Sequence, residues 1–225
     1  MQHSPAPPPL PRRIVRTFVA PRQLFEEIRE RAPWAGPLLI SIVAGMLVVL
    51  AVPEAAFVEA LEGAVTRRGE PVAITSPPAE IAKAGRMMGM LAVLVRQPLA
   101  AFLCAGVLML VFGVLLRGEG GFPQYLSVTT HAFLVTALGA LVAAGIALAR
   151  GTEPEAVSPA LLLPGGDASF AGRVLSSVDL FTVWALVVAA VGVSVVSHRG
   201  SGGRAAAVLL GLYLVAAVAV AAVAV

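Results

Sequence analysis

Five long apolar stretches limit what this chain can fold into. Each would be apolar on every side of a helix, and each is close to the ~20 residues that a helix needs to cross the hydrocarbon of a bilayer. Only 13% of the 225 residues are charged, whereas a soluble domain carries about 25%. We therefore predict an all-α polytopic membrane protein, a bundle of five transmembrane helices over about residues 34–52, 98–116, 125–149, 178–197 and 205–225.

Two short segments precede the first span. Residues 1–17 contain the run PAPPPLPRR, and such a Pro- and Arg-rich segment is typical of a disordered tail. Residues 18–33 predict an amphipathic helix, because Pro21 suits a first helical turn and Leu24, Phe25 and Ile28 share one face. We expect this helix to lie on the membrane surface or, equally well, to pack on the inner ends of the spans.

The connections between the spans indicate how the helices pair. Residues 53–85 predict one short helix, and the apolar residues 85–95 predict a second one, near the outer interface, that bends into the next span at Pro98. The short links RGEGGFP and SHRGSGGR predict two antiparallel hairpins, of the second span with the third and of the fourth with the fifth. Small residues on one face of the fourth span favour close helix packing: Ala185, Ala189 and Gly192.

The placement of arginine indicates the orientation. Six arginines between residues 12 and 31 precede the first span, and basic residues favour the cytoplasmic side of a membrane. We therefore expect a cytoplasmic N-terminus and, with five spans, a C-terminus outside. The basic leader is too long for a cleavable signal peptide. The composition, rich in Arg, Ala, Val and Gly, suggests a bacterial source, so the expected location is the bacterial cytoplasmic membrane.

The sequence contains no motif of a catalytic or cofactor site. It has no HExxH, GxSxG or CxxC run and no phosphate-binding loop. Cys104 is the single cysteine, which excludes an internal disulfide and a multi-cysteine metal site; we interpret it as a small buried hydrophobe. We expect no enzyme activity, no cofactor and no metal. The formal net charge of only +3 also argues against nucleic acid as a partner.

Four residues in or beside the spans are candidates for a structural or functional role: Arg96, Asp179, His131 and Trp184. Ionisable residues at membrane depth are costly and therefore suggest function. Arg96 and Asp179 both stand at the outer entrance of a span, and we hypothesise that they pair; Arg96 could instead reach the outer boundary alone. His131 is more typical of a helix-packing contact than of a haem or metal ligand with His198 as its partner. Trp184 is too deep for the interface and should pack between helices.

Two stretches carry a family resemblance. APRQLFEEIRERAPWAGPLL, with Pro21 and Phe25, and VDLFTVWALVVAAVGVSVV, with Asp179, Trp184 and Gly192, resemble the Yip domain family of Ypt/Rab-interacting membrane proteins, particularly its bacterial branch. The resemblance covers about residues 17–225. It implies five spans, a cytosolic N-terminus and, in eukaryotes, binding of small GTPases and shaping of early secretory membranes. The eukaryotic Asp-Leu-Tyr-Gly-Pro motif is missing here, which makes small-GTPase binding doubtful.

These features favour a non-enzymatic scaffold or adaptor that acts through protein or lipid contacts in the bilayer. Its expected partners are the lipid bilayer and other membrane proteins. The alternative is a small transporter or channel in which Arg96, Asp179 and His131 line a polar path. The two hypotheses differ in one structural respect. In a transporter these side chains would converge on one hydrated cavity, whereas in a scaffold they would make separate packing contacts.

Overall fold

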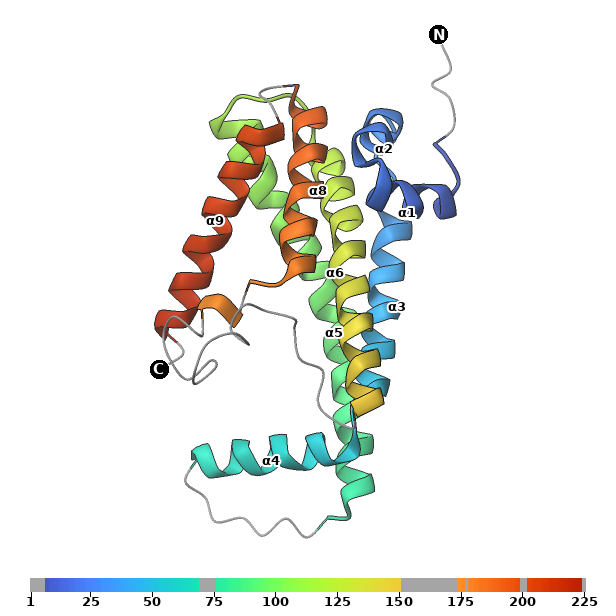
Figure 1. Ribbon diagram of the computed structural model, residues 1–225, viewed down its shortest axis with the longest axis vertical. Coiled ribbons are helices and arrows are strands. Elements are labelled where there is room, and N and C mark those ends of the chain that lie inside the picture. The colour runs from blue at the N-terminus through green and yellow to red at the C-terminus, as the bar shows by residue number, and fades with distance from the viewer. Residues whose placement is uncertain (1–6, 69–75, 151–173, 177, 199–201, 224–225) are drawn as a thin grey trace.

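The computed structural model describes residues 7–68, 76–150, 174–176, 178–198 and 202–223, and in these ranges the only regular secondary structure is helical. The fold is therefore an all-α membrane bundle, as predicted (Figure 1). The helices are α1 (Leu10–Val19), α2 (Pro21–Ile28), α3 (Ala35–Ala51), α4 (Glu54–Arg68), α5 (Pro78–Leu108), the π-helix η1 (Met109–Leu115), α6 (Phe122–Arg150), α8 (Leu180–Ser197) and α9 (Gly202–Val223).

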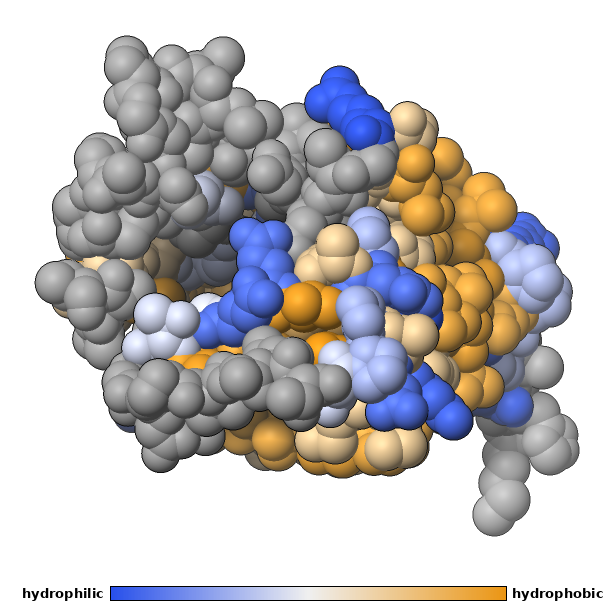
Figure 2. Space-filling view, turned by 90° about the horizontal axis from the view of Figure 1, so that it is seen from below, coloured by the Kyte–Doolittle hydropathy of each residue, from blue (hydrophilic) through white to orange (hydrophobic). Residues whose placement is uncertain are grey.

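Four to five helical units in these ranges are long and apolar enough to cross a membrane. Four of them are long and apolar enough by themselves: α5 with η1, α6, α8 and α9. A fifth requires α3 and α4 to be taken as one span, although the chain bends by 87° between them. Viewed from the α4 end of the bundle, hydrophilic residues gather on the end and apolar residues run along the flank (Figure 2). An apolar flank with polar ends is the surface that a bilayer requires.

The second span differs from the prediction of a bend at Pro98. α5 and η1 form 38 continuous residues, about 57 Å at 1.5 Å per residue, which exceeds the ~30 Å hydrocarbon thickness. A proline removes one helical hydrogen bond, but close packing on α3 and α6 supports the helix here. A Cβ atom added to Gly45 would lie 2.9 Å from Val93 Cγ1, so α3 and α5 already touch without spare room. The helix is irregular further on, at the π-helical turns of η1.

α4 lies across the end of α5 and is held there by one arginine. The Arg86 guanidinium is 5.7 Å from the centre of the Phe57 ring, 3.7 Å from the Glu54 carboxylate, and it donates a hydrogen bond to the Val52 carbonyl at 3.3 Å. The sequence predicted a short helix here, and the structure confirms it.

The long helices pack around the central helix α6: α3, α5 and α8 contact α6, and α9 contacts α8. The link between η1 and α6 is tight, as predicted, and it is tied to the end of α8 because the Glu119 amide donates to the Ser197 carbonyl at 3.0 Å. Gly120 in this link has φ +95°, a conformation that favours glycine.

The N-terminal segment differs from the sequence prediction. Residues 1–6 lie outside the described ranges, but Leu10–Val19 form α1 where a tail over 1–17 was expected to be disordered. The predicted single helix over 18–33 is also divided, since Ala20 has φ −150° and ψ 58°. The following Pro21 explains this break, because a proline disfavours helical geometry in the residue before it. We refer to α1 and α2 together as the N-terminal hairpin.

Candidate functional site

The N-terminal hairpin is packed into one end of the bundle. Leu24, Phe25 and Ile28 are at most 1% exposed, and α2 contacts α8 while α1 contacts α6. The Phe25 ring lies over Gly192 of α8, where an added Cβ would be 2.8 Å from Phe25 Cε2 and from Val128 Cγ1. The apolar stripe of α2 therefore faces protein and not lipid. Of the two expectations for this helix, packing on the ends of the spans fits the structure, and a membrane-surface position for the stripe does not.

Aromatic contacts fix the hairpin at two further points. Phe18 of α1 meets Trp184 edge to face, with ring centres 5.6 Å apart. Phe25 meets the His131 ring in the same manner at 6.0 Å. Edge-to-face pairs of aromatic rings are favourable beyond the area they bury. Trp184 thus packs between helices, as its depth in the span indicated.

His131 is fully buried under α2. Its Nδ1 atom is 2.7 Å from the Ser127 carbonyl, while its Nε2 atom and the Ser127 hydroxyl have no hydrogen-bond partner in the described part of the chain. His198, considered above as its second ligand, contacts Arg29 instead, with 2.6 Å between Arg29 Nη1 and His198 Nε2. Across the described ranges, no group of three or more His, Cys, Asp or Glu side chains is placed to hold a metal ion. His131 is therefore positioned as a packing residue.

The entry to the hairpin is anchored by Arg13. Its guanidinium donates to the Pro8 carbonyl at 3.0 Å and to the Pro33 carbonyl at 3.1 Å, so it joins the two ends of the hairpin. Burial lowers the pKa of the Arg13 guanidinium below its usual value, but arginine stays protonated in proteins. The outward face of the hairpin carries two ion pairs, Arg16 with Glu27 and Arg22 with Glu26.

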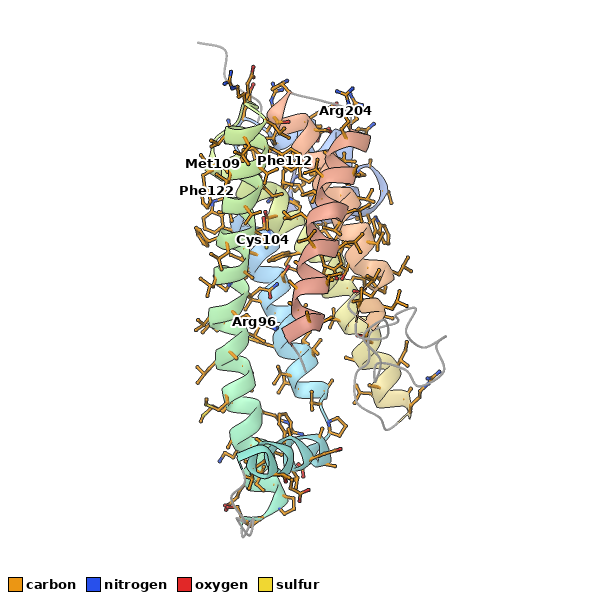
Figure 3. The ribbon with its side chains drawn as sticks, turned by 90° about the vertical axis from the view of Figure 1, so that its left-hand side faces the viewer. Arg96, Cys104, Met109, Phe112, Phe122 and Arg204 are labelled. Atoms are coloured by element: carbon orange, nitrogen blue, oxygen red, sulfur yellow. The ribbon has the colours of Figure 1, made fainter. Side chains whose placement is uncertain are left out.

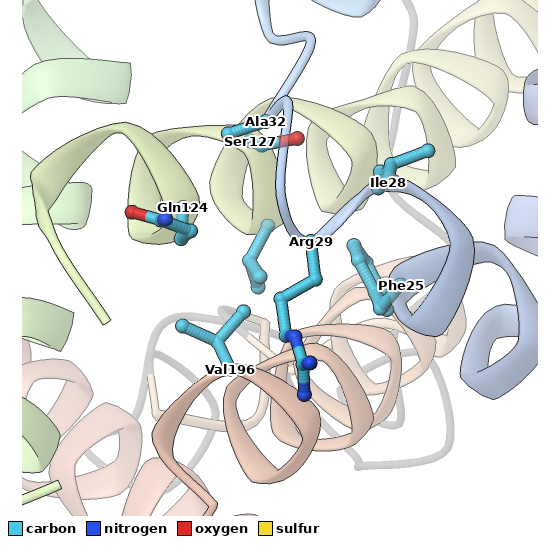
Figure 4. A pocket seen from close by; sticks show the side chains of 8 residues that line it. Phe25, Ile28, Arg29, Ala32, Gln124, Ser127 and Val196 are labelled. Atoms are coloured by element: carbon cyan, nitrogen blue, oxygen red, sulfur yellow. The ribbon is translucent and has the colours of Figure 1, made fainter. Parts of the chain in front are cut away.

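A polar contact closes the edge between the hairpin and α8. Arg29 reaches His198 at the left-handed C-cap of α8, and His198 is 3.9 Å from the Glu119 carboxylate. Three elements meet here: α2, α8 and the link before α6. A small pocket beside this contact is lined by Arg29, Gln124, Ser127 and Val196, among others (Figure 4). It is too tight to hold a small molecule, so this edge is a joint in the fold.

The predicted pair of Arg96 and Asp179 does not form. The Asp179 carboxylate caps α8, since its Oδ1 accepts hydrogen bonds from the Phe181 amide at 2.8 Å and the Thr182 amide at 3.0 Å. Arg96 is exposed on α5 and makes no ion pair with any residue in the described ranges. α5 packs on α3 and α6, whereas α8 packs on α6 and α9, and α5 and α8 make little contact with each other. An N-cap interaction therefore explains the carboxylate better than a bridge between helices.

An apolar groove of about 390 Å³ lies among α5, α6, α8 and α9. α6 and α8 form its floor, and α5 and α9 form its walls, which we call the α5–α9 groove; it is lined by Leu103, Cys104, Val107, Leu108, Thr129, Ala132, Phe133, Thr136, Thr182, Ala185, Leu186, Ala189, Leu209, Leu212, Tyr213 and Ala216. Figure 3 shows its two walls with Cys104 on α5. Cys104 is exposed in this groove, so its interpretation as a buried hydrophobe is wrong. Arg96, Asp179 and His131 do not line the groove.

The groove could not be identified from the sequence. Its lining residues are mostly apolar. An apolar residue on a spanning helix can face lipid, protein or a groove, and the sequence pattern is the same in all three cases. The contact between the hairpin and α8, by contrast, involves residues that the sequence singles out, because Phe25 and Gly192 both belong to the stretches that carry the family resemblance.

One comparison with known proteins identifies a family. The family described as the Yip1 domain matches residues 15–224, nearly the whole chain. No curated protein and no solved structure matches the chain.

Proposed function

The chain belongs to the Yip1 domain family, and from this we propose that it is a non-enzymatic membrane adaptor that holds partner proteins through contacts at one end of its bundle. It is an integral membrane protein. Its proposed location is the bacterial cytoplasmic membrane, with the arginine-rich N-terminus in the cytoplasm and the C-terminus outside. Small-GTPase binding is not part of the proposal, because the motif that supports it in eukaryotic members is absent.

The observation that carries this proposal is the separation of the polar residues. Arg96 is exposed on α5, Asp179 caps α8, and His131 lies under α2. Transport of a polar solute needs polar side chains that converge on a water-filled path. The α5–α9 groove is instead apolar, and none of the three residues lines it. This arrangement favours contacts over transport.

The N-terminal hairpin provides a rigid surface for such contacts. Its apolar stripe and its aromatic residues are fixed in the bundle, so the polar residues on its outer face are held in a constant orientation. Gln23, Glu26 and Glu27 are exposed on α2. A preformed surface binds with a smaller loss of conformational entropy than a flexible tail. On α1, Val15 and Val19 are 58% and 74% exposed, and these two side chains could rest in the bilayer interface beside the surface.

Site-specific photo-crosslinking in native membranes tests this proposal. A photoreactive amino acid at Gln23, exposed on α2, should give one or a few discrete protein adducts, and the same residue at Glu59, exposed on α4, should not. The adducts at Gln23 should disappear when Phe25→Ala releases the hairpin. If Gln23 and Glu59 give the same adducts, or neither gives a protein adduct, the hairpin is not a partner surface and the proposal is wrong.

A further inference from the structure

The α5–α9 groove opens sideways from the bundle and sits deep among the spanning helices. On α9 its lining runs from Leu209 to Ala216, which begins about 10 Å from the first residue of the helix and continues for about 10 Å more. On α6, the lining residues Thr129 and Thr136 lie at the same distances from the start of their helix. The groove therefore lies within the apolar part of the bundle, and its opening faces the hydrocarbon of the bilayer.

The lining of the groove is almost wholly apolar, and its polar groups are three threonine hydroxyls, the Cys104 thiol and the Tyr213 hydroxyl. The threonine hydroxyls donate within their own helices: Thr129 to the Tyr125 carbonyl at 3.0 Å, Thr136 to the Phe133 carbonyl at 3.0 Å, and Thr182 to the Asp179 carboxylate. Water in such a site would find few hydrogen-bond partners. We therefore expect an occupant that is apolar along most of the groove.

The size of the groove suits a hydrocarbon chain. The groove holds about 390 Å³, which lies in the usual range for small ligands. A flexible hydrocarbon chain can follow such a groove between helices.

Both walls of the groove carry an arginine at the same end of the bundle. Arg117 follows the last turn of η1, and Arg204 lies in the first turn of α9, and both are exposed. Figure 3 shows Arg204 at that end, above the level of Cys104. The N-terminus of α9 adds a partial positive charge of its own. Basic residues between spanning helices attract anionic lipid headgroups.

We propose that the α5–α9 groove is a binding site for one anionic phospholipid, with an acyl chain in the groove and the phosphate between Arg117 and Arg204. The rise of about 8 Å along α9 from Arg204 to Leu209, the first lining residue on that helix, leaves room for the glycerol backbone and the start of the chain. This site is separate from the partner surface on the hairpin and requires only that the protein spans a membrane.

Native mass spectrometry of the full-length protein, purified in mild detergent and titrated with phosphatidylglycerol or phosphatidylcholine, tests the site. We expect one phosphatidylglycerol to bind more tightly than phosphatidylcholine. Arg117→Gln and Arg204→Gln should each weaken the binding of phosphatidylglycerol about five-fold, because each cation near the surface contributes ~1 kcal/mol. Neither substitution should change the binding of phosphatidylcholine.

A matched pair of variants on α9 tests the acyl-chain site. Leu212 and Leu214 are 43% and 47% exposed, but only Leu212 lines the groove. Leu212→Trp should fill the groove and abolish the bound lipid, while Leu214→Trp should retain it, with equal thermal stability in both. If both variants bind lipid like the original chain, or if a protein and not a lipid is retained at this surface, the assignment is wrong. Equal binding of the two lipids, unaffected by Arg117→Gln and Arg204→Gln, would equally overturn it.

Discussion

Replacing Phe25 with alanine is expected to release the N-terminal hairpin from the bundle. Phe25 is 1% exposed, it covers Gly192 and its ring meets that of His131, so the truncation leaves a cavity that three helices border. Removal of a buried Phe side chain costs about 3–5 kcal/mol. Unfolding of the purified protein in mixed micelles, followed by tryptophan fluorescence, should show a loss of this size, because Trp184 reports its contact with Phe18.

Val19→Ala is the control for this experiment. Val19 is also an apolar residue of the hairpin, but it is 74% exposed, and surface substitutions usually change stability by less than about 0.5 kcal/mol. A hairpin that only rests on the membrane surface would show similar small losses for Phe25→Ala and Val19→Ala. That result would contradict the docking described above.

Gly192→Leu should separate the hairpin from α8 by adding volume where none is available. A Cβ at Gly192 would lie 2.8 Å from atoms of both Phe25 and Val128, closer than side-chain atoms can approach. Overpacking a filled core costs typically ~1–3 kcal/mol and can displace whole elements. We expect trypsin to cleave at the arginines of the hairpin at least about five-fold faster in this variant, since cleavage follows the population of the opened state and 1.4 kcal/mol is a factor of ten.

Gly211→Leu is the matched control, because no atom lies within 4 Å of a Cβ added at Gly211. Both changes put leucine for glycine in a spanning helix, so a general effect of helix propensity would appear in both variants. Equal proteolysis of Gly192→Leu and Gly211→Leu would show that the contact between Phe25 and Gly192 does not hold the hairpin.

The helical bundle could be predicted from the sequence because a bilayer imposes strict requirements on spanning segments. The limits of α6, α8 and α9 follow from the lengths of their apolar runs, and the tight link before α6 follows from its glycines. The apolar stripe on α2 could also be predicted from the sequence, since Leu24, Phe25 and Ile28 share one helical face. Periodicity shows that such a face is buried, but it does not show whether lipid or protein buries it.

The remaining features depend on contacts between distant segments. The continuous α5 could not be predicted because Pro98 and Arg96 normally interrupt a span, and only packing on α3 and α6 supports the helix there. α1 forms in a segment whose composition suggests disorder, because Arg13 ties it to the Pro33 carbonyl. Arg96 and Asp179 both stand at the entrance of a predicted span, which suggested a pair. A carboxylate at the start of a helix instead accepts hydrogen bonds from amides of its own first turn.

The reactivity of Cys104 tests most directly whether the bundle contains a hydrated path. Cys104 is the single cysteine and lines the groove. A thiol reacts as its thiolate, which forms only where water can stabilise the charge. In intact membranes, a charged, membrane-impermeant thiol reagent should leave Cys104 unmodified from either side, while it modifies a Gln23→Cys control in a Cys104→Ala background. Modification of Cys104 as fast as the control would mean that water fills the groove, and it would favour a transporter over an adaptor.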